Sequence, residues 1–173
     1  MTSVNSHKRL IVMGVTASGK STIGAALANR LGAAFLDGDD FHPEANVRKM
    51  ASGQPLTDDD RWPWLDRLGA AMDDRVAKSG EAVLACSALR LVYRKRLARA
   101  VAGPITFIHL AGSPDLLSRR MGERQDHFMP VGLLDSQLAT LEPLTAEERG
   151  LTVPIDQSVE QTIAQILERL SPR

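Results

Sequence analysis

The sequence predicts an α/β domain in which a five-stranded parallel sheet carries helices on both faces. Three observations favour this class. Five short apolar runs have the length of buried strands, the segments between them show helical periodicity, and the two kinds alternate along the chain. Consecutive parallel strands need a crossover connection, so the alternation favours right-handed β-α-β units. With 173 residues, the chain is expected to form one domain, residues 1–173.

The apolar runs lie at residues 9–13, 34–36, 82–86, 105–110 and 151–155. Between them, apolar side chains recur at helical spacing, and each set marks the buried face of one expected helix. These sets are Ile23, Leu27 and Leu31; Leu65, Leu68, Met72 and Val76; Leu89, Tyr93 and Leu97; and Val159, Ile163, Ile166, Leu167 and Leu170. Pro43, Pro63 and Pro114 are each expected in a first helical turn, and Ser158 is expected to cap the last helix.

A phosphate-binding loop follows the first strand and opens the first helix. Residues 14–21 fit the pattern G-x-x-x-x-G-K-[ST], at the position in the chain that phosphate binding requires. Glycines allow the backbone to wrap around phosphate oxygens, and the helix N-terminus adds partial positive charge. We expect Lys20 to bridge the β- and γ-phosphates and Ser21 to bind Mg²⁺. The predicted nucleotide-binding residues of the loop are Gly14, Val15, Thr16, Ala17, Ser18, Gly19, Lys20, Ser21 and Thr22.

Composition and missing motifs exclude several other classes. A switch GTPase needs a guanine-binding Asn-Lys-x-Asp, which the sequence lacks. Basic and acidic residues number 21 each, which gives no support for a protein that coats nucleic acid or an anionic membrane. The apolar run at residues 10–13 is too short for a signal or membrane segment, and the single Cys86 cannot form an intrachain disulfide. We therefore expect a soluble cytoplasmic domain with neither a nucleic-acid nor a membrane partner.

Two carboxylates, Asp37 and Asp39, follow the second strand one residue apart. They lie where open α/β sheets bind ligands, at the carboxyl end of a strand. In such a pair one carboxylate holds a magnesium-bound water and the other accepts a hydroxyl proton. We expect Asp37 on the metal side and Asp39 at the hydroxyl. The alternative is an acidic turn that caps the following helix.

The neutral charge is an average over opposite segments. Residues 35–75 hold ten acidic and five basic side chains, whereas residues 76–125 hold nine basic and three acidic ones. In the first segment, the Arg61 guanidinium is a candidate for binding a substrate carboxylate. In the second, Arg120 and Arg124 lie one helical turn apart and are candidates to neutralise a triphosphate during transfer. The alternative for this pair is a solvated helix face.

The whole pattern resembles the bacterial-type gluconokinases, short P-loop enzymes that phosphorylate D-gluconate with ATP. The matching blocks are residues 13–21, 35–39, 42–43, 46, 49–56, 58–61, 63–65, 86–89, 93–94, 127–128, 133–134, 136–137 and 141–142. The family implies a P-loop NTPase fold similar to nucleoside monophosphate kinases, a lid at approximately 120–142 and a homodimer. Ala17 replaces a glycine usual in the family, Arg90 replaces a frequent lysine, and the usual Walker B aspartate is missing from the 105–110 strand.

The resemblance implies phosphorylation of the C6 hydroxyl of D-gluconate, giving 6-phospho-D-gluconate and ADP, with Mg²⁺ held by Ser21 and Asp37. The implied catalytic residues are Lys20, Asp39, Arg120 and Arg124. The implied substrate-binding residues are Asp39, His42, Lys49, Arg61, Ser87, Arg94 and His127, of which Lys49, Arg61 and Arg94 are alternatives for the carboxylate. Two other functions remain open: a kinase of another small hydroxy acid, such as shikimate, and a nucleotide-binding regulator without transfer activity.

Overall fold

The computed structural model describes residues 9–123 and 132–171. Its sheet has five parallel strands in the order β2-β3-β1-β4-β5 among these residues. The strands are β1 (Arg9–Met13), β2 (Ala34–Asp37), β3 (Ala82–Ala85), β4 (Thr106–Ala111) and β5 (Gly150–Pro154). All five predicted strands are therefore confirmed, with ends that differ by at most one residue.

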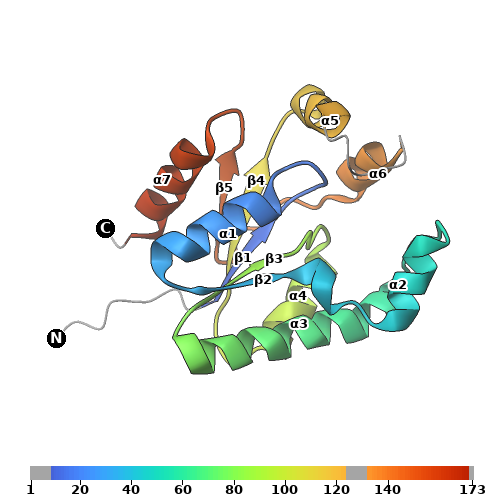
Figure 1. Cartoon of the computed structure of the whole chain (residues 1–173), viewed down its shortest axis with the longest axis horizontal. Helices are drawn as coiled ribbons and strands as arrows, with labels where there is room; N and C mark the ends of the chain where they lie inside the picture. Colours follow the sequence, from blue (N-terminus) through green and yellow to red (C-terminus); the bar gives the residue numbers. More distant parts are fainter. Residues whose placement is uncertain (1–8, 124–131, 172–173) are drawn as a thin grey trace.

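Helices cover both faces of the sheet, as predicted (Figure 1). The helices are α1 (Lys20–Leu31), the 3₁₀ helix η1 (Gly38–Phe41), α2 (Glu44–Ala51), α3 (Asp58–Ser79), α4 (Leu91–Ala100), α5 (Pro114–Glu123), α6 (Leu133–Thr140) and α7 (Val159–Leu170). Helices α1 and α7 pack together on one face, and α3 and α4 pack together on the other. The crossovers from β1 through α1 and from β2 through α3 supply these two layers.

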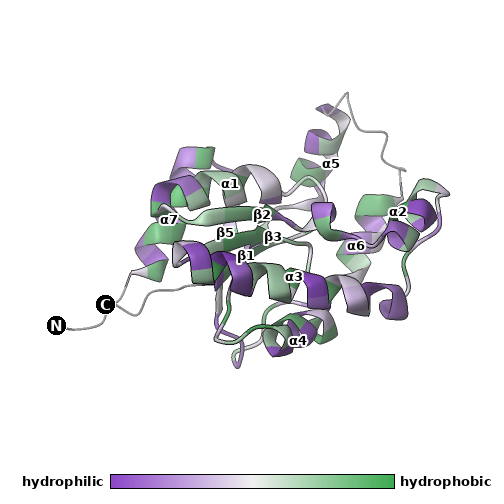
Figure 2. Cartoon of the chain, turned by 60° about the horizontal axis from the view of Figure 1, so that its bottom comes forward, coloured by the Kyte–Doolittle hydropathy of each residue, from purple (hydrophilic) through white to green (hydrophobic). Residues whose placement is uncertain are grey.

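Two apolar clusters fill the spaces between sheet and helices. Strand side chains alternate between them: Leu10 and Val12 face the α1/α7 side, whereas Ile11 and Met13 face the α3/α4 side. Figure 2 shows the resulting pattern, with hydrophobic strands between helices that carry both hydrophilic and hydrophobic residues. Because both faces are covered, the strands are continuous apolar runs rather than alternating ones.

Of three local predictions, the structure confirms one and contradicts two. Ser158 caps α7 as predicted, in a capping box with Gln161. The prediction that Pro63 lies in a first helical turn is wrong, because Thr57 caps α3 and the helix begins at Asp58. Pro63 has no N–H to donate to the preceding turn, so α3 continues past it without that hydrogen bond. Leu89 is buried but precedes α4, so it is not on that helix.

The carboxyl ends of the strands gather the segments singled out in the sequence. The phosphate loop follows β1, Asp37 ends β2, and Ser87 lies just beyond β3. Figure 1 shows α5 and α6 beside the phosphate loop, and α2 projecting at the same end of the molecule. Within the described residues, no helix is both long and apolar enough to span a membrane.

Candidate active site

The phosphate loop has the backbone conformation that phosphate binding requires. Gly14 has φ +153°, and a Cβ there would lie 2.7 Å from the Ser18 hydroxyl oxygen, so only glycine fits. Ala17 has φ +66°, in the left-handed region that disfavours residues with a Cβ. Glycine adopts this conformation without strain, so a glycine would suit the position that Ala17 occupies. Gly19, with φ +91°, then turns the chain into α1.

Contacts within and beside the loop fix its position. The Lys20 ammonium donates to the Val15 carbonyl at 3.0 Å, and the Ser18 N–H donates to the same carbonyl at 3.2 Å. The Gly14 N–H donates to the Ser87 carbonyl at 3.3 Å. Ser87, predicted to bind substrate, therefore lies against the loop through its backbone.

Ser21 and Asp37, the two predicted magnesium ligands, meet at the start of α1. The Ser21 hydroxyl donates to Asp37 Oδ2 at 2.8 Å. The other carboxylate oxygen, Oδ1, accepts from the Asp39 N–H at 3.1 Å and so caps η1. The Asp37 carboxylate thus connects the phosphate loop to the acidic turn, and the turn holds Asp39 next to it.

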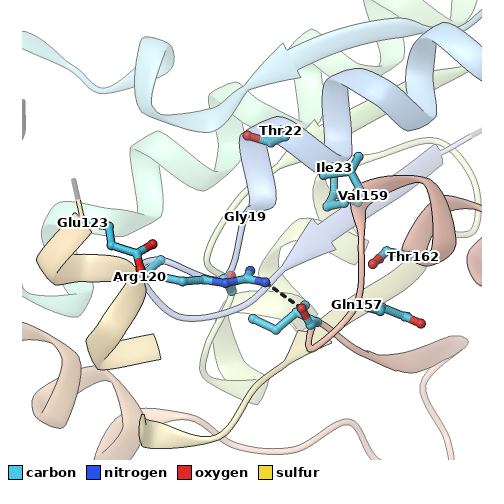
Figure 3. A pocket seen from close by; sticks show the side chains of 11 residues that line it. Gly19, Thr22, Ile23, Arg120, Glu123, Gln157, Val159 and Thr162 are labelled. Carbon is cyan, nitrogen blue, oxygen red and sulfur yellow. Dashed lines mark hydrogen bonds between the residues drawn. The ribbon is translucent and has the colours of Figure 1, made fainter. Parts of the chain in front are cut away.

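A pocket of about 350 Å³ opens beside the loop, between α1, α5 and the start of α7 (Figure 3). Its lining residues are Ala17, Ser18, Gly19, Thr22, Ile23, Arg120, Glu123, Ile155, Gln157, Val159 and Thr162. The Arg120 guanidinium crosses this pocket and donates to the Ile155 carbonyl at 2.7 Å. The pocket is continuous with the phosphate-binding backbone, so its position suits the base and ribose of a nucleotide.

The acidic turn carries Asp39 and His42 toward the N-terminal part of α3. The His42 ring stacks on Trp64, with 4.2 Å between ring centroids, and the Trp64 indole donates to the Gly38 carbonyl at 2.8 Å. Burial lowers the pKa of His42, Asp39 opposes this shift, and Arg61 adds to it. Asp39 and Arg61 therefore act on the same imidazole from different elements.

The Cys86 thiol is buried just beyond β3, and charged side chains from three elements act on it. Burial raises the pKa of Cys86 to about 12, while the charges of Lys20 and Arg61 act to lower it and that of Asp39 to raise it. These three side chains come from the phosphate loop, η1 and α3. The charges of all three side chains therefore act on the same thiol from different elements.

The Arg61 side chain lies over the Tyr93 ring, and its Nε atom donates to no carboxylate. Its guanidinium carbon lies 5.2 Å from the centre of the Tyr93 ring, and its buried Nε has no hydrogen-bond partner. The Tyr93 hydroxyl donates to Asp58 at 2.7 Å, and Arg90 pairs with the same carboxylate at 2.8 Å. A buried N–H without a partner is costly, so the Arg61 guanidinium keeps an unused donor in this structure.

Lys49 is near this group but already paired. Its ammonium lies 2.5 Å from Asp60 Oδ2, and Asp60 also completes the Thr57 capping box. The buried Asn46 side chain donates to the Asp60 carbonyl at 3.0 Å and thereby fastens α2 to the start of α3. The arrangement gives Lys49 an intramolecular partner, whereas the Arg61 Nε has none.

The prediction that Arg94 binds substrate is not supported, because its guanidinium lies in the interior. Arg94 is 1% exposed, and its Nε donates to both carboxylate oxygens of Glu148 at 3.0 and 3.1 Å. Its remaining nitrogens donate to the carbonyls of Ala88, Leu89 and Pro143. Arg94 therefore organises the segment after β3 instead of facing a ligand.

Two predicted site residues, Arg124 and His127, lie outside the described residues. Conversely, the structure adds pocket residues that the sequence analysis did not identify, namely Glu123, Ile155, Gln157, Val159 and Thr162. Their only signal in the sequence is position, because most follow the last strand. A further residue that was not identified, Gln137, contacts the phosphate loop from α6.

Several known proteins are similar to this chain in sequence or in structure. A family model described as an AAA domain matches residues 10–144. A gluconokinase of Gluconobacter oxydans is 50% identical over 133 residues, covering 77% of this chain and 74% of the relative. A probable gluconokinase of Xenopus tropicalis is 42% identical over 171 residues, covering 91% and 90%. The crystal structure of a gluconokinase from Sinorhizobium meliloti 1021 has a TM-score of 0.82 at 43% identity, covering 95% of this chain and 91% of that one.

Proposed function

Because this chain belongs to the gluconokinase family of P-loop kinases, we propose that it transfers the γ-phosphoryl group of ATP to the C6 hydroxyl of D-gluconate. The products are 6-phospho-D-gluconate and ADP. The observation that carries this proposal is the hydrogen-bonded link between the phosphate loop and the acidic turn. The Asp37 carboxylate accepts from the Ser21 hydroxyl at 2.8 Å and from the Asp39 N–H at 3.1 Å. A phosphate-binding ammonium, a proton acceptor and a free guanidinium donor are what transfer to an anionic polyol requires.

The nucleotide lies along the phosphate loop and in the pocket beside it. Backbone N–H groups of residues 14–22 and the N-terminus of α1 bind the phosphates, apart from those of Gly14, Thr16 and Ser18, which donate within the protein. Lys20 bridges the β- and γ-phosphates. Arg120 already crosses the pocket, where its guanidinium can neutralise nucleotide charge. Arg124 belongs to the same proposal, as the second arginine that stabilises the transferring group.

Asp39 is the general base of the proposed reaction. Its position in η1 is set by its own N–H, which donates to Asp37 Oδ1 at 3.1 Å. The Asp39 carboxylate orients the C6 hydroxyl and accepts its proton late, as the oxygen bonds to phosphorus and the bond from phosphorus to the ADP oxygen breaks. The γ-phosphoryl group thus passes to gluconate, and ADP leaves with the electron pair.

Arg61 binds the gluconate carboxylate in this proposal. Its Nε is buried and lacks a partner, whereas Lys49 and Arg94 are held by Asp60 and Glu148. Of the three cations considered from the sequence, Arg61 is therefore the one whose donor a substrate would satisfy. His42, Ser87 and His127 are proposed to contact the polyol hydroxyls.

The oxygen donors present suit Mg²⁺. Ser21 and Asp37 offer a hydroxyl and a carboxylate 2.8 Å apart beside the phosphate loop. Among the described residues, no group of three or more His, Cys, Asp or Glu side chains could hold a metal ion. This set fits Mg²⁺, which usually takes one or two protein ligands together with phosphates and waters. When bound, the ion neutralises phosphate charge, and Ser21 and Asp37 are the residues that would hold it.

An acceptor panel tests the proposed function. ADP release is measured with gluconate, shikimate and nucleoside monophosphates under identical conditions, and we expect gluconate to give the highest kcat/KM. A higher kcat/KM for shikimate or a monophosphate would overturn the substrate assignment. ATP binding without gluconate-dependent turnover would favour a regulator instead, although Asp39 would then have no role in transfer.

The family also suggests a homodimer in the cytoplasm, with a lid at approximately 120–142. These features stay predictions of the sequence. Light scattering on the purified protein measures the mass in solution, and a value of twice the 18.8 kDa chain mass is expected.

A further inference from the structure

Helix α6 contacts the phosphate loop through one polar side chain, Gln137. The Thr16 N–H donates to Gln137 Oε1 at 2.6 Å, across 121 positions of sequence. Because the Thr16 partner is an N–H, the atom that accepts must be the carboxamide oxygen, which fixes the orientation of the amide. The two residues belong to elements that lie side by side in Figure 1.

The peptide that Gln137 binds also holds the catalytic lysine. The N–H of Thr16 and the carbonyl of Val15 belong to one planar peptide unit. On its N–H side this unit donates to Gln137, and on its carbonyl side it accepts from Lys20 Nζ at 3.0 Å and from the Ser18 N–H at 3.2 Å. Rotation of the plane would move both ends together. Gln137 therefore fixes the carbonyl to which Lys20 is bound.

Apolar packing supports this contact from the same helix. Leu134 is 4% exposed and belongs to the apolar cluster that includes Val15 and Ala17 of the phosphate loop. Leu138 packs against the same cluster. Helix α6 thus packs on the same apolar cluster as the phosphate loop, and Gln137 adds a direct hydrogen bond to the loop.

The segment after α6 is anchored to the turn that follows β3. The Glu142 N–H donates to the Leu89 carbonyl at 2.8 Å, and its carboxylate accepts from the Leu91 N–H at 2.6 Å. Arg94 then joins the Leu89 carbonyl to the Pro143 carbonyl. With its C-terminal end held in this way, α6 has a defined position from which Gln137 can orient the loop.

We propose that Gln137 is a positioning residue for phosphoryl transfer, which holds the Val15–Thr16 peptide plane and through it the ammonium of Lys20. This inference rests on the proposed kinase function, because Lys20 acts there on the transferred phosphate. A misplacement of a reacting group by about 1 Å can lower a rate by ~10²-fold. The effect of Gln137 is therefore expected on kcat rather than on the binding of gluconate.

Hydrogen exchange at the Thr16 amide tests the contact without any substrate. In the nucleotide-free protein, Gln137→Leu is expected to speed Thr16 exchange by ~5-fold, because a single hydrogen bond stabilises modestly. Gln137→Glu keeps an acceptor oxygen and should restore the protection. Thr140→Ala is the matched control on the same helix, since its hydroxyl donates to Ser136 within α6. Unchanged Thr16 exchange in Gln137→Leu would overturn the proposal.

Steady-state kinetics test the consequence. Gln137→Leu should lower kcat by ~10-fold and leave the gluconate KM within ~2-fold, because it misplaces Lys20 without touching the acceptor site. Gln137→Glu should raise the ATP KM, since its charge repels the triphosphate. Faster Thr16 exchange with wild-type kcat would refute a positioning role. If Gln137→Leu does not fold, Gln137→Asn, which is shorter by one methylene, replaces it. Failure of the wild-type enzyme to phosphorylate gluconate would instead refute the proposed function and leave the exchange result standing.

Discussion

The two halves of the candidate site present charged and polar groups by different means. On the nucleotide side, residues 14–21 are contiguous and present backbone N–H groups, and their conformation depends on Gly14 and Gly19. On the acceptor side, the groups come from η1, α2 and α3, and most charges are already paired within the protein. One half is a local backbone structure, and the other depends on tertiary packing.

This difference explains which cations are available to substrates. Lys49, Arg90 and Arg94 all lie near the acceptor segment, yet each has a carboxylate partner at 3.0 Å or less. Arg61 instead rests on Tyr93 and has a buried Nε without a partner. Charge in the sequence therefore identifies candidates, and intramolecular pairing is the reason why we propose Arg61 among them.

The largest effect is expected from Lys20→Ala on the nucleotide side. Removal of the ammonium should lower kcat by at least ~10³-fold, because it removes direct stabilisation of the transferred group. A coupled ADP assay measures the loss. Lys78→Ala is the control, since that lysine pairs with Asp74 on the exposed end of α3. Near-normal turnover by Lys20→Ala would remove the loop lysine from the mechanism.

Arg94→Met should act on stability. The change leaves the Glu148 carboxylate, whose side chain is 12% exposed, without its partner. Breaking a buried pair in this way costs about 3–5 kcal/mol, measured by urea unfolding. Arg96→Met, which breaks an exposed pair with Asp66, should cost less than ~1 kcal/mol. A raised gluconate KM with unchanged stability would return Arg94 to the acceptor site.

Arg61→Met should raise the gluconate KM by ~10–100-fold, because a charged hydrogen bond is lost. The ATP KM should stay unchanged, since Arg61 lies on the acceptor side. Lys49→Met is the matched comparison, and its gluconate KM should change by less than ~3-fold because that lysine pairs with Asp60. The opposite ranking of these two variants would assign the carboxylate to Lys49.

The smallest effect concerns acid stability. The hydrogen bond from Lys49, followed by those from Thr57, lowers the pKa of Asp60 from 3.8 to about 2. The ionised carboxylate therefore stabilises the fold above pH 4, and this contribution is lost as the pH falls from about 4 toward 2. Asp60→Asn should have a lower free energy of unfolding than wild type at pH 7. Below pH 3, the free energies of unfolding of the two proteins should become more similar, because wild-type Asp60 becomes protonated. Asp59→Asn serves as control, and an equal pH profile for both variants would contradict the assignment.

The sequence was sufficient for the fold and the nucleotide side because both follow from local patterns. Five apolar runs predicted the strands, and the spacing around Gly14, Gly19 and Lys20 predicted the loop. Asp37 ends β2 and accepts from Ser21, and its carboxylate also caps η1, as the alternative of a capping acidic turn predicted. The strands and the loop follow from neighbouring residues, whereas the Ser21–Asp37 contact joins positions 16 apart.

The acceptor side and the contact from α6 needed three-dimensional structure. Nothing in the neighbourhood of Arg94 indicates that Glu148, 54 positions away, pairs with it. The Gln137 contact with Thr16 joins segments even further apart. Pro63 was misplaced for a related reason, because the Thr57–Asp60 capping box outweighs the tendency of proline to begin a helix.

Asp39→Asn tests most directly the claim that the phosphate loop binds ATP while Asp39 accepts the proton of the acceptor hydroxyl. ATP binding and gluconate-dependent ADP release are measured on the same preparation. We expect wild-type ATP affinity and a kcat lower by ~10²–10⁴-fold, because only the proton acceptor is lost. A kcat close to wild type, with the loss confined to the gluconate KM, would make Asp39 a binding residue and contradict its role as general base.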